Sequence, residues 1–239
     1  MQAFHDIHLE TIQGCNRKCA FCPNKDIAST GALMSRELFD QIIGQLVEMD
    51  FRGYVRPYLM NEPFLDERMP EMMRYIREKL PKALCVVNTN GELLTTEMAR
   101  ELAGIGVKLR VSCYTPDVLK RFLLAKIGRT WITDYTHAAE KLPAGFMNRA
   151  GNIELPGPEP GVGGCMFPFN EIYIRHDGKV VLCCNDWKSQ VVMGDANRTP
   201  LLTIFNNRKF ANYRRWLGNK ERRPPLCSQC NQDEERSYI

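Results

Sequence analysis

Three cysteines lie close together near the start of the chain, in the stretch "GCNRKCAFCPNK". They are Cys15, Cys19 and Cys22. Thiolates bind zinc and iron–sulfur clusters, and sites of either kind usually take four protein ligands. This stretch supplies only three, which leaves one coordination position for another molecule. An open position is typical of a catalytic metal centre rather than a structural one.

A second group of cysteines lies in the last third of the chain. Its members are Cys165, Cys183, Cys227 and Cys230. Four thiolates are enough to close an iron–sulfur cluster completely. A closed cluster leaves no position for a substrate, so we expect it to transfer electrons or to support the fold. Cys184 is an alternative to Cys183, because neighbouring side chains on a strand point to opposite faces.

Zinc is the alternative metal for both groups. His8 could complete the first site, and the four later cysteines could form the second. However, the spacing of the early cysteines is unusual for a zinc knuckle, and Phe21 beside Cys22 suits a flat ligand better than a structural site. The pattern therefore favours iron.

Composition and charge exclude several classes of protein. The 239 residues include 32 basic and 28 acidic ones, a net charge of +4 that is too small to indicate a nucleic-acid partner. The start of the chain has no apolar core of a signal peptide, and no apolar run approaches the ~18 residues of a membrane span. We expect a cytoplasmic protein, where thiols stay reduced and are available to metals.

Strand and helix patterns alternate along the first half of the chain. Strands are expected at 5–11, 54–59, 83–91 and 107–114, and helices at 35–49, 66–80 and 95–106. This order predicts a parallel sheet with right-handed crossovers. The first cysteine group, "NEP" at 61–63 and "NTNG" at 88–91 each follow a strand, so the three polar motifs should meet at one rim of the sheet.

A stretch rich in Gly and Pro, 151–164, predicts a boundary between a domain of residues 1–150 and a second one of residues 151–239. Within the second domain, residues 171–184 indicate a β-hairpin with Asp177 and Gly178 at its turn. Residues 199–217 have the pattern of a single helix.

The early motif "CNRKCAFC" resembles the CxxxCxxC signature of the radical SAM superfamily. Other shared features are "NEP", "TNG", an NRxG motif at 148–151 and the cysteine spacing of the tail. The resemblance implies an α/β fold, a partial and abridged (β/α) radical SAM barrel followed by a small C-terminal twitch domain, which is a shortened SPASM domain. It also implies the cofactors, S-adenosylmethionine (SAM) and two 4Fe-4S clusters, one SAM-binding and one auxiliary.

The same resemblance implies roles for individual residues. SAM would complete the open cluster of the first cysteine group, and the second group would hold the auxiliary cluster. Residues expected to contact SAM are Phe21, Asn61, Glu62, Thr89, Asn90 and Ser112. The family usually has Gly where this chain has Asn61, so the side chain of Asn61 must fit near the cofactor.

The resemblance is greatest to a dehydrogenase branch that oxidises a secondary alcohol of an aminocyclitol. It implies that a sugar or aminocyclitol is the substrate, that Arg149 contacts the reacting hydroxyl, and that a flavodoxin- or ferredoxin-type protein is the reductant. An epimerase or a peptide-modifying enzyme of the same superfamily is the first alternative, with Cys113 as a hydrogen-atom donor unless it is a buried core residue. A non-enzymatic zinc or iron–sulfur module is the second.

Overall fold

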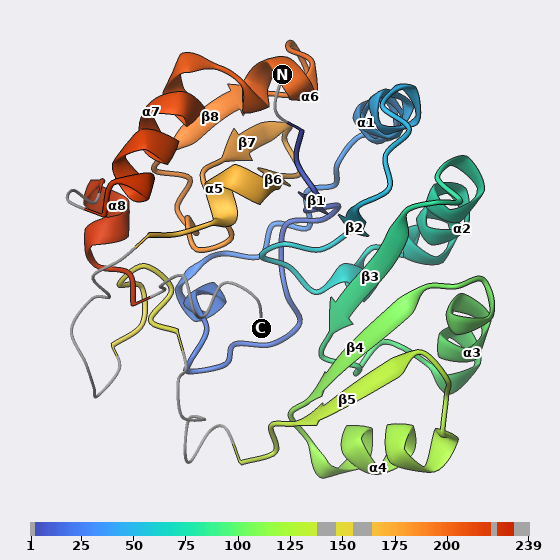
Figure 1. Ribbon diagram of the computed structural model, residues 1–239. Helices are drawn as coiled ribbons and strands as arrows, with labels where there is room; N and C mark the ends of the chain where they lie inside the picture. The colour runs from blue at the N-terminus through green and yellow to red at the C-terminus, as the bar shows by residue number, and fades with distance from the viewer. Residues whose placement is uncertain (1–2, 138–146, 155–163, 221–223, 232–239) are drawn as a thin grey trace.

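The computed structural model of the protein describes residues 3–137, 147–154, 164–220 and 224–231. Its centre is one open, mixed sheet of eight strands in the order β5-β4-β3-β2-β1-β6-β7-β8 (Figure 1). The sheet does not close on itself. This confirms the predicted α/β fold with an abridged barrel.

The first half of the chain alternates strands and helices, and all of its strand pairs are parallel. The elements are β1 (Asp6–Leu9), α1 (Arg36–Glu48), β2 (Tyr54–Arg56), α2 (Met69–Lys79), β3 (Leu84–Thr89), α3 (Thr96–Gly104), β4 (Lys108–Cys113), α4 (Pro116–Ala125) and β5 (Thr130–Asp134). Helices α1 to α4 cover one side of the sheet (Figure 1). Two short 3-10 helices, η1 (Pro23–Asp26) and η2 (Pro63–Leu65), lie in loops that follow β1 and β2.

Capping side chains fix where the helices begin. Ser35, Thr95 and Thr115 each accept a hydrogen bond from the backbone N–H three residues later, which satisfies a donor that has no partner within the helix. Pro70 lies in the first turn of α2, where its missing N–H costs nothing. The helix boundaries expected from the sequence are therefore confirmed to within a few residues.

The second half of the chain extends the same sheet. Its elements are α5 (Phe167–Asn170), β6 (Glu171–Ile174), β7 (Lys179–Val181), β8 (Val192–Asp195), α6 (Leu201–Phe205), α7 (Arg208–Gly218) and α8 (Pro225–Ser228). Strand β6 pairs in parallel with β1, and β6 and β7 form the predicted hairpin. The single helix predicted at 199–217 is wrong, because Asn207 caps a new helix and divides the segment into α6 and α7.

The two faces of the sheet differ in polarity. Ile7, Val55 and Ile172 point toward the helices and belong to the main hydrophobic core, together with side chains of α1 to α4, α6 and α7. Because side chains alternate along a strand, the neighbours of these residues line the opposite face, where His8 and Tyr173 are buried. This second face is polar, and the two cysteine groups lie in the loops around it.

Candidate active site

The loop that carries the first cysteine group is held by its own polar side chains. Gly14 has a φ of +145°, and a Cβ there would approach Cβ of Ser29 to 2.9 Å, so this position requires glycine. The Nζ of Lys18 donates to the carbonyls of Asn24 and Ile27 at 2.7 and 2.6 Å. These contacts fold the loop back on itself and keep its cysteines together.

The loop is also joined to the second polar motif, as the sequence predicts. The N–H of Glu62 donates to the carbonyl of Gly14 at 2.9 Å, and Nδ2 of Asn24 donates to the carbonyl of Met60 at 2.8 Å. The third motif joins through Asn90, whose Nδ2 donates to Oδ1 of Asn16 at 2.7 Å. All three motifs therefore meet at the carboxyl ends of the parallel strands.

Glu62 is the buried acid of this rim, with 2% of its surface exposed. Its carboxylate accepts hydrogen bonds from Oγ1 of Thr89 at 2.6 Å, from the N–H of Asn90 at 2.8 Å and from the N–H of Phe64 at 3.2 Å. Burial raises its pKa, although these three bonds act in the opposite direction. A carboxylate offers about four acceptor positions, so one remains for a cation such as the ammonium group of an amino acid.

Asn61 supplies a donor without a partner. Its Oδ1 accepts from the N–H of Leu59 at 2.9 Å, while its Nδ2 is buried and has no hydrogen-bond partner in the structure. A buried polar group without a partner is costly and often indicates a missing ligand. The free acceptor position on Glu62 fits the ammonium group of an amino-acid ligand. The donor on the neighbouring Asn61 fits the carboxylate group of the same ligand.

Aromatic rings line the cysteine loop on the side that faces the end of β4. The ring of Phe21 lies 5.5 Å from that of Tyr114, which stacks on Tyr135 at 5.5 Å. Burial raises the pKa of Tyr114, and the charge of Cys19 raises it further, which places this phenol beside the first cysteine group. Ser112 lies in β4, two positions before Tyr114. The sequence predicts that Phe21 and Ser112 contact SAM, and it does not single out Tyr114.

The chemistry of the first cysteine group fits a cationic cluster. The pKa of Cys15 is raised to about 11, chiefly by burial and also by the negative charges of Glu62, Cys22 and Cys19, although a backbone hydrogen bond from Arg17 lowers it. Three thiolates are therefore unfavourable together unless a cation balances them. Iron held by the three sulfurs would remove this penalty.

The second cysteine group surrounds a cavity between α5, α7 and α8. Cys165, Cys183, Cys227 and Cys230 all line it, together with apolar side chains such as Leu217. Cys184 does not line this cavity. The structure thus brings together the four cysteines that the sequence predicts, and it separates Cys184 from them.

The spacing of the sulfurs disfavours a single zinc ion. Ligands around one tetrahedral zinc lie about 3.8 Å apart, given Zn–S bonds near 2.3 Å. Among the residues that the structure describes, no three cysteine sulfurs lie within 4.8 Å of one another. A larger cluster places its thiolates further apart. His8, the possible fourth zinc ligand, lies with Asp6 and Glu171 and not with the first cysteine group.

Arg149 lies between the two cysteine groups. Its positive charge lowers the pKa of Cys22 in the first loop and that of Cys184 next to the second group, although burial raises both. Its Nη1 is 3.5 Å from Oδ1 of Asn185. A guanidinium within reach of both groups can hold the oxygen of a molecule placed between them.

The neighbours of Arg149 fix its position. Asn148 donates to the carbonyl of Gln229 at 2.6 Å and is joined to Asn231 by two further hydrogen bonds, so the NRxG motif is attached to the tail that carries Cys230. Gly151 has a φ of +79°, and a Cβ there would approach Oε1 of Gln229 to 2.6 Å. The motif is therefore a structural connection to the second cysteine group as well as the carrier of Arg149.

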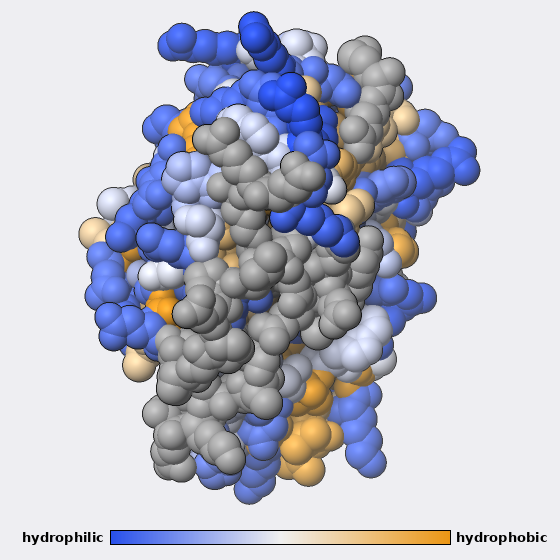
Figure 2. All heavy atoms as spheres, turned by 60° about the vertical axis from the view of Figure 1, so that its left-hand side comes forward, coloured by the Kyte–Doolittle hydropathy of each residue, from blue (hydrophilic) through white to orange (hydrophobic). Residues whose placement is uncertain are grey.

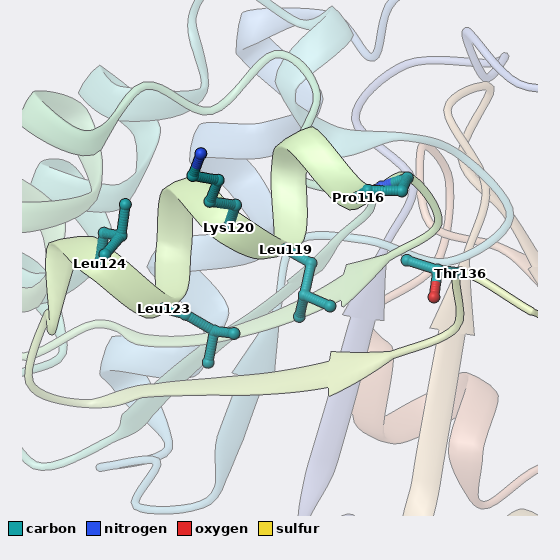
Figure 3. A pocket seen from close by; sticks show the side chains of 6 residues that line it. All are labelled: Pro116, Leu119, Lys120, Leu123, Leu124 and Thr136. Carbon is teal, nitrogen blue, oxygen red and sulfur yellow. The ribbon is translucent and has the colours of Figure 1, made fainter.

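Another hollow in the surface lacks chemistry. It lies beside α4 and β5, with Leu119 and Leu123 on the β5 side of the helix, and contains no cysteine (Figure 3). Its lining is mostly aliphatic, with Lys120 and Thr136 as the polar members.

Among the described residues, no helix is long and apolar enough to cross a membrane. Hydrophilic residues make up most of the coloured surface in Figure 2.

Comparison with known families settles the class of the protein. Residues 9–143 match the radical SAM superfamily. The chain belongs to the radical SAM superfamily. Residues 165–231 match SPASM, an iron–sulfur cluster-binding domain. The protein is therefore a radical SAM enzyme whose cofactors are SAM and 4Fe-4S clusters, one of them auxiliary. These predictions from the sequence are confirmed.

Relatives of the chain include one of nearly equal length. The S-adenosyl-L-methionine-dependent 2-deoxy-scyllo-inosamine dehydrogenase of Niallia circulans is 26% identical over 250 residues, which cover 99% of this chain and 98% of that protein. The Fe-coproporphyrin III synthase of Methanosarcina barkeri is 33% identical over 98 residues, 39% of this chain and 23% of that protein. The sequence resemblance to the dehydrogenase branch is thus confirmed.

Solved structures show the same fold. The crystal structure of BtrN in complex with AdoMet and 2-DOIA has a TM-score of 0.82 and 24% identity, and covers 100% of both chains. Native anSMEcpe with bound AdoMet has a TM-score of 0.63 and 13% identity, and covers 96% of this chain and 91% of that one. At these identities the likeness concerns the fold alone.

Proposed function

We propose that this enzyme oxidises a secondary alcohol of an aminocyclitol, or of a closely related amino sugar, to a ketone. One observation carries the proposal: Arg149 lies within electrostatic reach of a three-cysteine group on one side and of Cys184, beside a four-cysteine group, on the other. This is the arrangement that an alcohol needs when one centre starts its oxidation and another accepts the last electron. The near full-length similarity to a dehydrogenase supports it.

The roles of the cysteines follow from their grouping. Cys15, Cys19 and Cys22 would hold the SAM-binding cluster, and the four cysteines around the second cavity would hold the auxiliary cluster. These four are Cys165, Cys183, Cys227 and Cys230. Residues 1–150 would form the SAM-binding domain and residues 151–239 the auxiliary-cluster domain, reduced by a flavodoxin- or ferredoxin-type protein.

SAM bound at the first cluster would supply the radical chemistry that takes a hydrogen atom from a carbon bearing a hydroxyl. The chain's own residues would hold this cofactor. Glu62, oriented by Thr89 and Asn90, would accept from the ammonium group, and Nδ2 of Asn61 would donate to the carboxylate. Phe21 and Ser112 would line the SAM site on the side where Tyr114 lies.

Arg149 acts on the substrate. Its guanidinium donates hydrogen bonds to the reacting hydroxyl and stabilises the negative charge that develops on oxygen as the alcohol is oxidised. Because the guanidinium stays positively charged, it can also donate hydrogen bonds to the ketone oxygen at the end of the reaction.

Epimerisation receives no support from the structure. An epimerase needs a hydrogen-atom donor that faces the substrate, and Cys113 was the candidate. Its side chain has 0% exposure and points into the hydrophobic core on the helix side of β4, while Ser112 occupies the other face. Cys113 therefore behaves as a small core residue.

The test is anaerobic turnover of reconstituted enzyme with SAM, dithionite or reduced flavodoxin, and 2-deoxy-scyllo-inosamine. We expect ketone and 5'-deoxyadenosine in equal amounts. Deuterium placed on the carbinol carbons should appear in 5'-deoxyadenosine. Recovery of an epimer that carries solvent deuterium, with no ketone, would contradict the proposal.

A further inference from the structure

A buried polar cluster on the open face of the sheet has no role in the scheme above. His8 projects from β1 and Glu171 from β6, and Nε2 of His8 lies 2.9 Å from Oε2 of Glu171. The hydroxyl of Tyr173 donates to the same carboxylate oxygen at 2.5 Å. The parallel pairing of β1 with β6 brings these side chains together, although they are 163 positions apart in the chain.

The hydrogen bonds define which nitrogen of His8 is basic. The pKa of Glu171 is lowered, because the hydrogen bonds and charges of its neighbours outweigh the effect of burial. The carboxylate is therefore ionised and accepts a hydrogen bond from Nε2–H of His8. A neutral imidazole that donates through Nε2 has its lone pair on Nδ1. This Nδ1 is buried and has no hydrogen-bond partner, and only 8% of His8 is exposed.

Charged and titratable side chains from β1, β2, β6 and the loop after β2 surround His8. On β1, Asp6 is ion-paired with Arg56 of β2 at 3.0 Å. The ring of His8 stacks on that of Tyr173 at 4.6 Å and meets the edge of Tyr58, on the loop after β2, at 5.7 Å.

This network also argues against a metal. Asp6, His8 and Glu171 place three possible ligand atoms within 4.8 Å of one another. However, the guanidinium of Arg56 already neutralises Asp6, and it would repel a divalent cation. The free lone pair on His8 is therefore better suited to a proton than to a metal ion.

The cluster lies beside Arg149. Arg149 contacts Asn185, which follows Cys184 in the chain, and the ring of Tyr173 stacks on that of His8 at 4.6 Å. A substrate hydroxyl held by Arg149 would therefore lie over the same face of the sheet as the His8 and Glu171 pair. The arrangement is that of a histidine base oriented by a carboxylate.

We propose that His8, oriented by Glu171, accepts the proton that the substrate hydroxyl loses on oxidation. This inference rests on the proposed dehydrogenase function. Oxidation of the alcohol removes a hydrogen atom from carbon, which passes to the radical derived from SAM. The hydroxyl proton passes to Nδ1 of His8, the remaining electron passes to the oxidised auxiliary cluster, and the C–O bond becomes a carbonyl. Atoms and electrons balance without another reactant.

The first arm of the test needs no turnover. Affinity for 2-deoxy-scyllo-inosamine is measured by calorimetry on the holoenzyme with SAM and no reductant, between pH 5.5 and pH 8.5. An imidazole nitrogen accepts a hydrogen bond from a hydroxyl only while it carries no proton, so affinity should fall at low pH. The variants His8→Gln and Glu171→Gln should lose this pH dependence. The control His176→Gln, which alters a second histidine–glutamate pair with Glu10 at 3.0 Å, should keep it.

The second arm measures products in single turnover with substrate deuterated at its carbinol carbons. His8→Gln should still transfer deuterium to 5'-deoxyadenosine but should form about a hundredfold less ketone per 5'-deoxyadenosine. A fall of both products in proportion, or an unchanged product ratio and pH profile, would overturn the role of His8. If wild type and His176→Gln form neither product, the proposed function itself fails, and the inference fails with it.

Discussion

At the scale of single residues, the site depends on adjacent positions that do different work. Cys183 lines the second cavity, whereas Cys184 does not. Asn148 holds the tail, while Arg149 lies beside Asn185. Neighbouring residues in a sequence often look equivalent, so substitutions at such pairs separate their roles most sharply.

The adjacent cysteines give the first prediction. Cys183→Ser should lose the auxiliary cluster and retain about four of about eight irons per chain, because the cavity loses one of its four thiolates. Cys184→Ser is the matched control and should keep both clusters. Iron and acid-labile sulfide analysis after anaerobic reconstitution distinguishes them. Equal losses in both variants would contradict the assignment of Cys183.

Arg149 gives the second prediction. Arg149→Lys keeps the positive charge but loses the paired donors of the guanidinium, so kcat/KM for the alcohol should fall about a hundredfold. Iron content and SAM affinity should stay at the wild-type level, because the lysine still occupies a site between the clusters. Steady-state ketone formation and calorimetry with SAM measure the two effects. Unchanged kcat/KM would show that Arg149 does not contact the hydroxyl.

At the scale of elements, caps and cross-strand pairs position the site. Asn207 begins α7 by accepting from the N–H of Phe210 at 2.9 Å, and its Nδ2 donates to the carbonyl of Met193 at 2.8 Å. Helix α7 contributes Leu217 to the wall of the second cavity. The break between α6 and α7 thus sets the direction of a helix that surrounds the auxiliary cluster.

Removing this cap is the third prediction. Asn207→Ala should lower the free energy of unfolding by about 1–2 kcal/mol, because an N-cap and a second hydrogen bond are lost together. Asn212→Ala, at a half-buried position within α7, should change it by less than about 0.5 kcal/mol. Denaturant titration monitored by circular dichroism gives both values. Equal effects would mean that Asn207 does not cap the helix.

The pair between β1 and β6 gives the fourth prediction, which concerns pH. Because the pKa of Glu171 is lowered on folding, its contribution to stability is present above its ordinary value of 4.5 and is lost as pH falls through the lowered pKa. Glu171→Gln should therefore cost about 1–3 kcal/mol at pH 7. The difference from wild type should shrink as the pH falls well below 4.5.

Unfolding by denaturant at pH 7, 5 and 3.5 measures this difference. A constant difference at all three values would show that folding does not lower the pKa of Glu171, and the orientation of His8 would then lack its cause.

Local patterns predicted the elements well, because helical spacing and capping residues act within a few positions. Ser35 and the apolar residues of α1 are an example, and so is the Asp177–Gly178 turn. The break at Asn207 was missed, although Asn is a common N-cap residue and the N–H that it caps, that of Phe210, is only three positions later. The proximity of His8 and Glu171 depends on β1 pairing with β6, which no periodicity reports.

At the scale of the whole molecule, one sheet carries both parts of the site. The first cysteine group follows β1, and β6 pairs with the same strand. The second group lies in the segments that precede and follow the hairpin, and in the tail that Asn148 holds. Cysteine spacing predicted both groups, and the resemblance of the first motif and of the other shared motifs indicated the radical SAM family. It did not predict that Arg149 would lie between them, because that depends on how the tail folds back.

The most direct test of the account is iron and acid-labile sulfide per chain, with EPR of the reduced protein recorded with and without SAM. We expect about eight irons and two signals, of which SAM changes only one. A variant with Cys15, Cys19 and Cys22 all changed to Ala should retain about four irons and lose the signal that responds to SAM. Zinc in place of iron, or spectra that SAM leaves unchanged, would contradict an open cluster and a closed cluster on the two sides of Arg149.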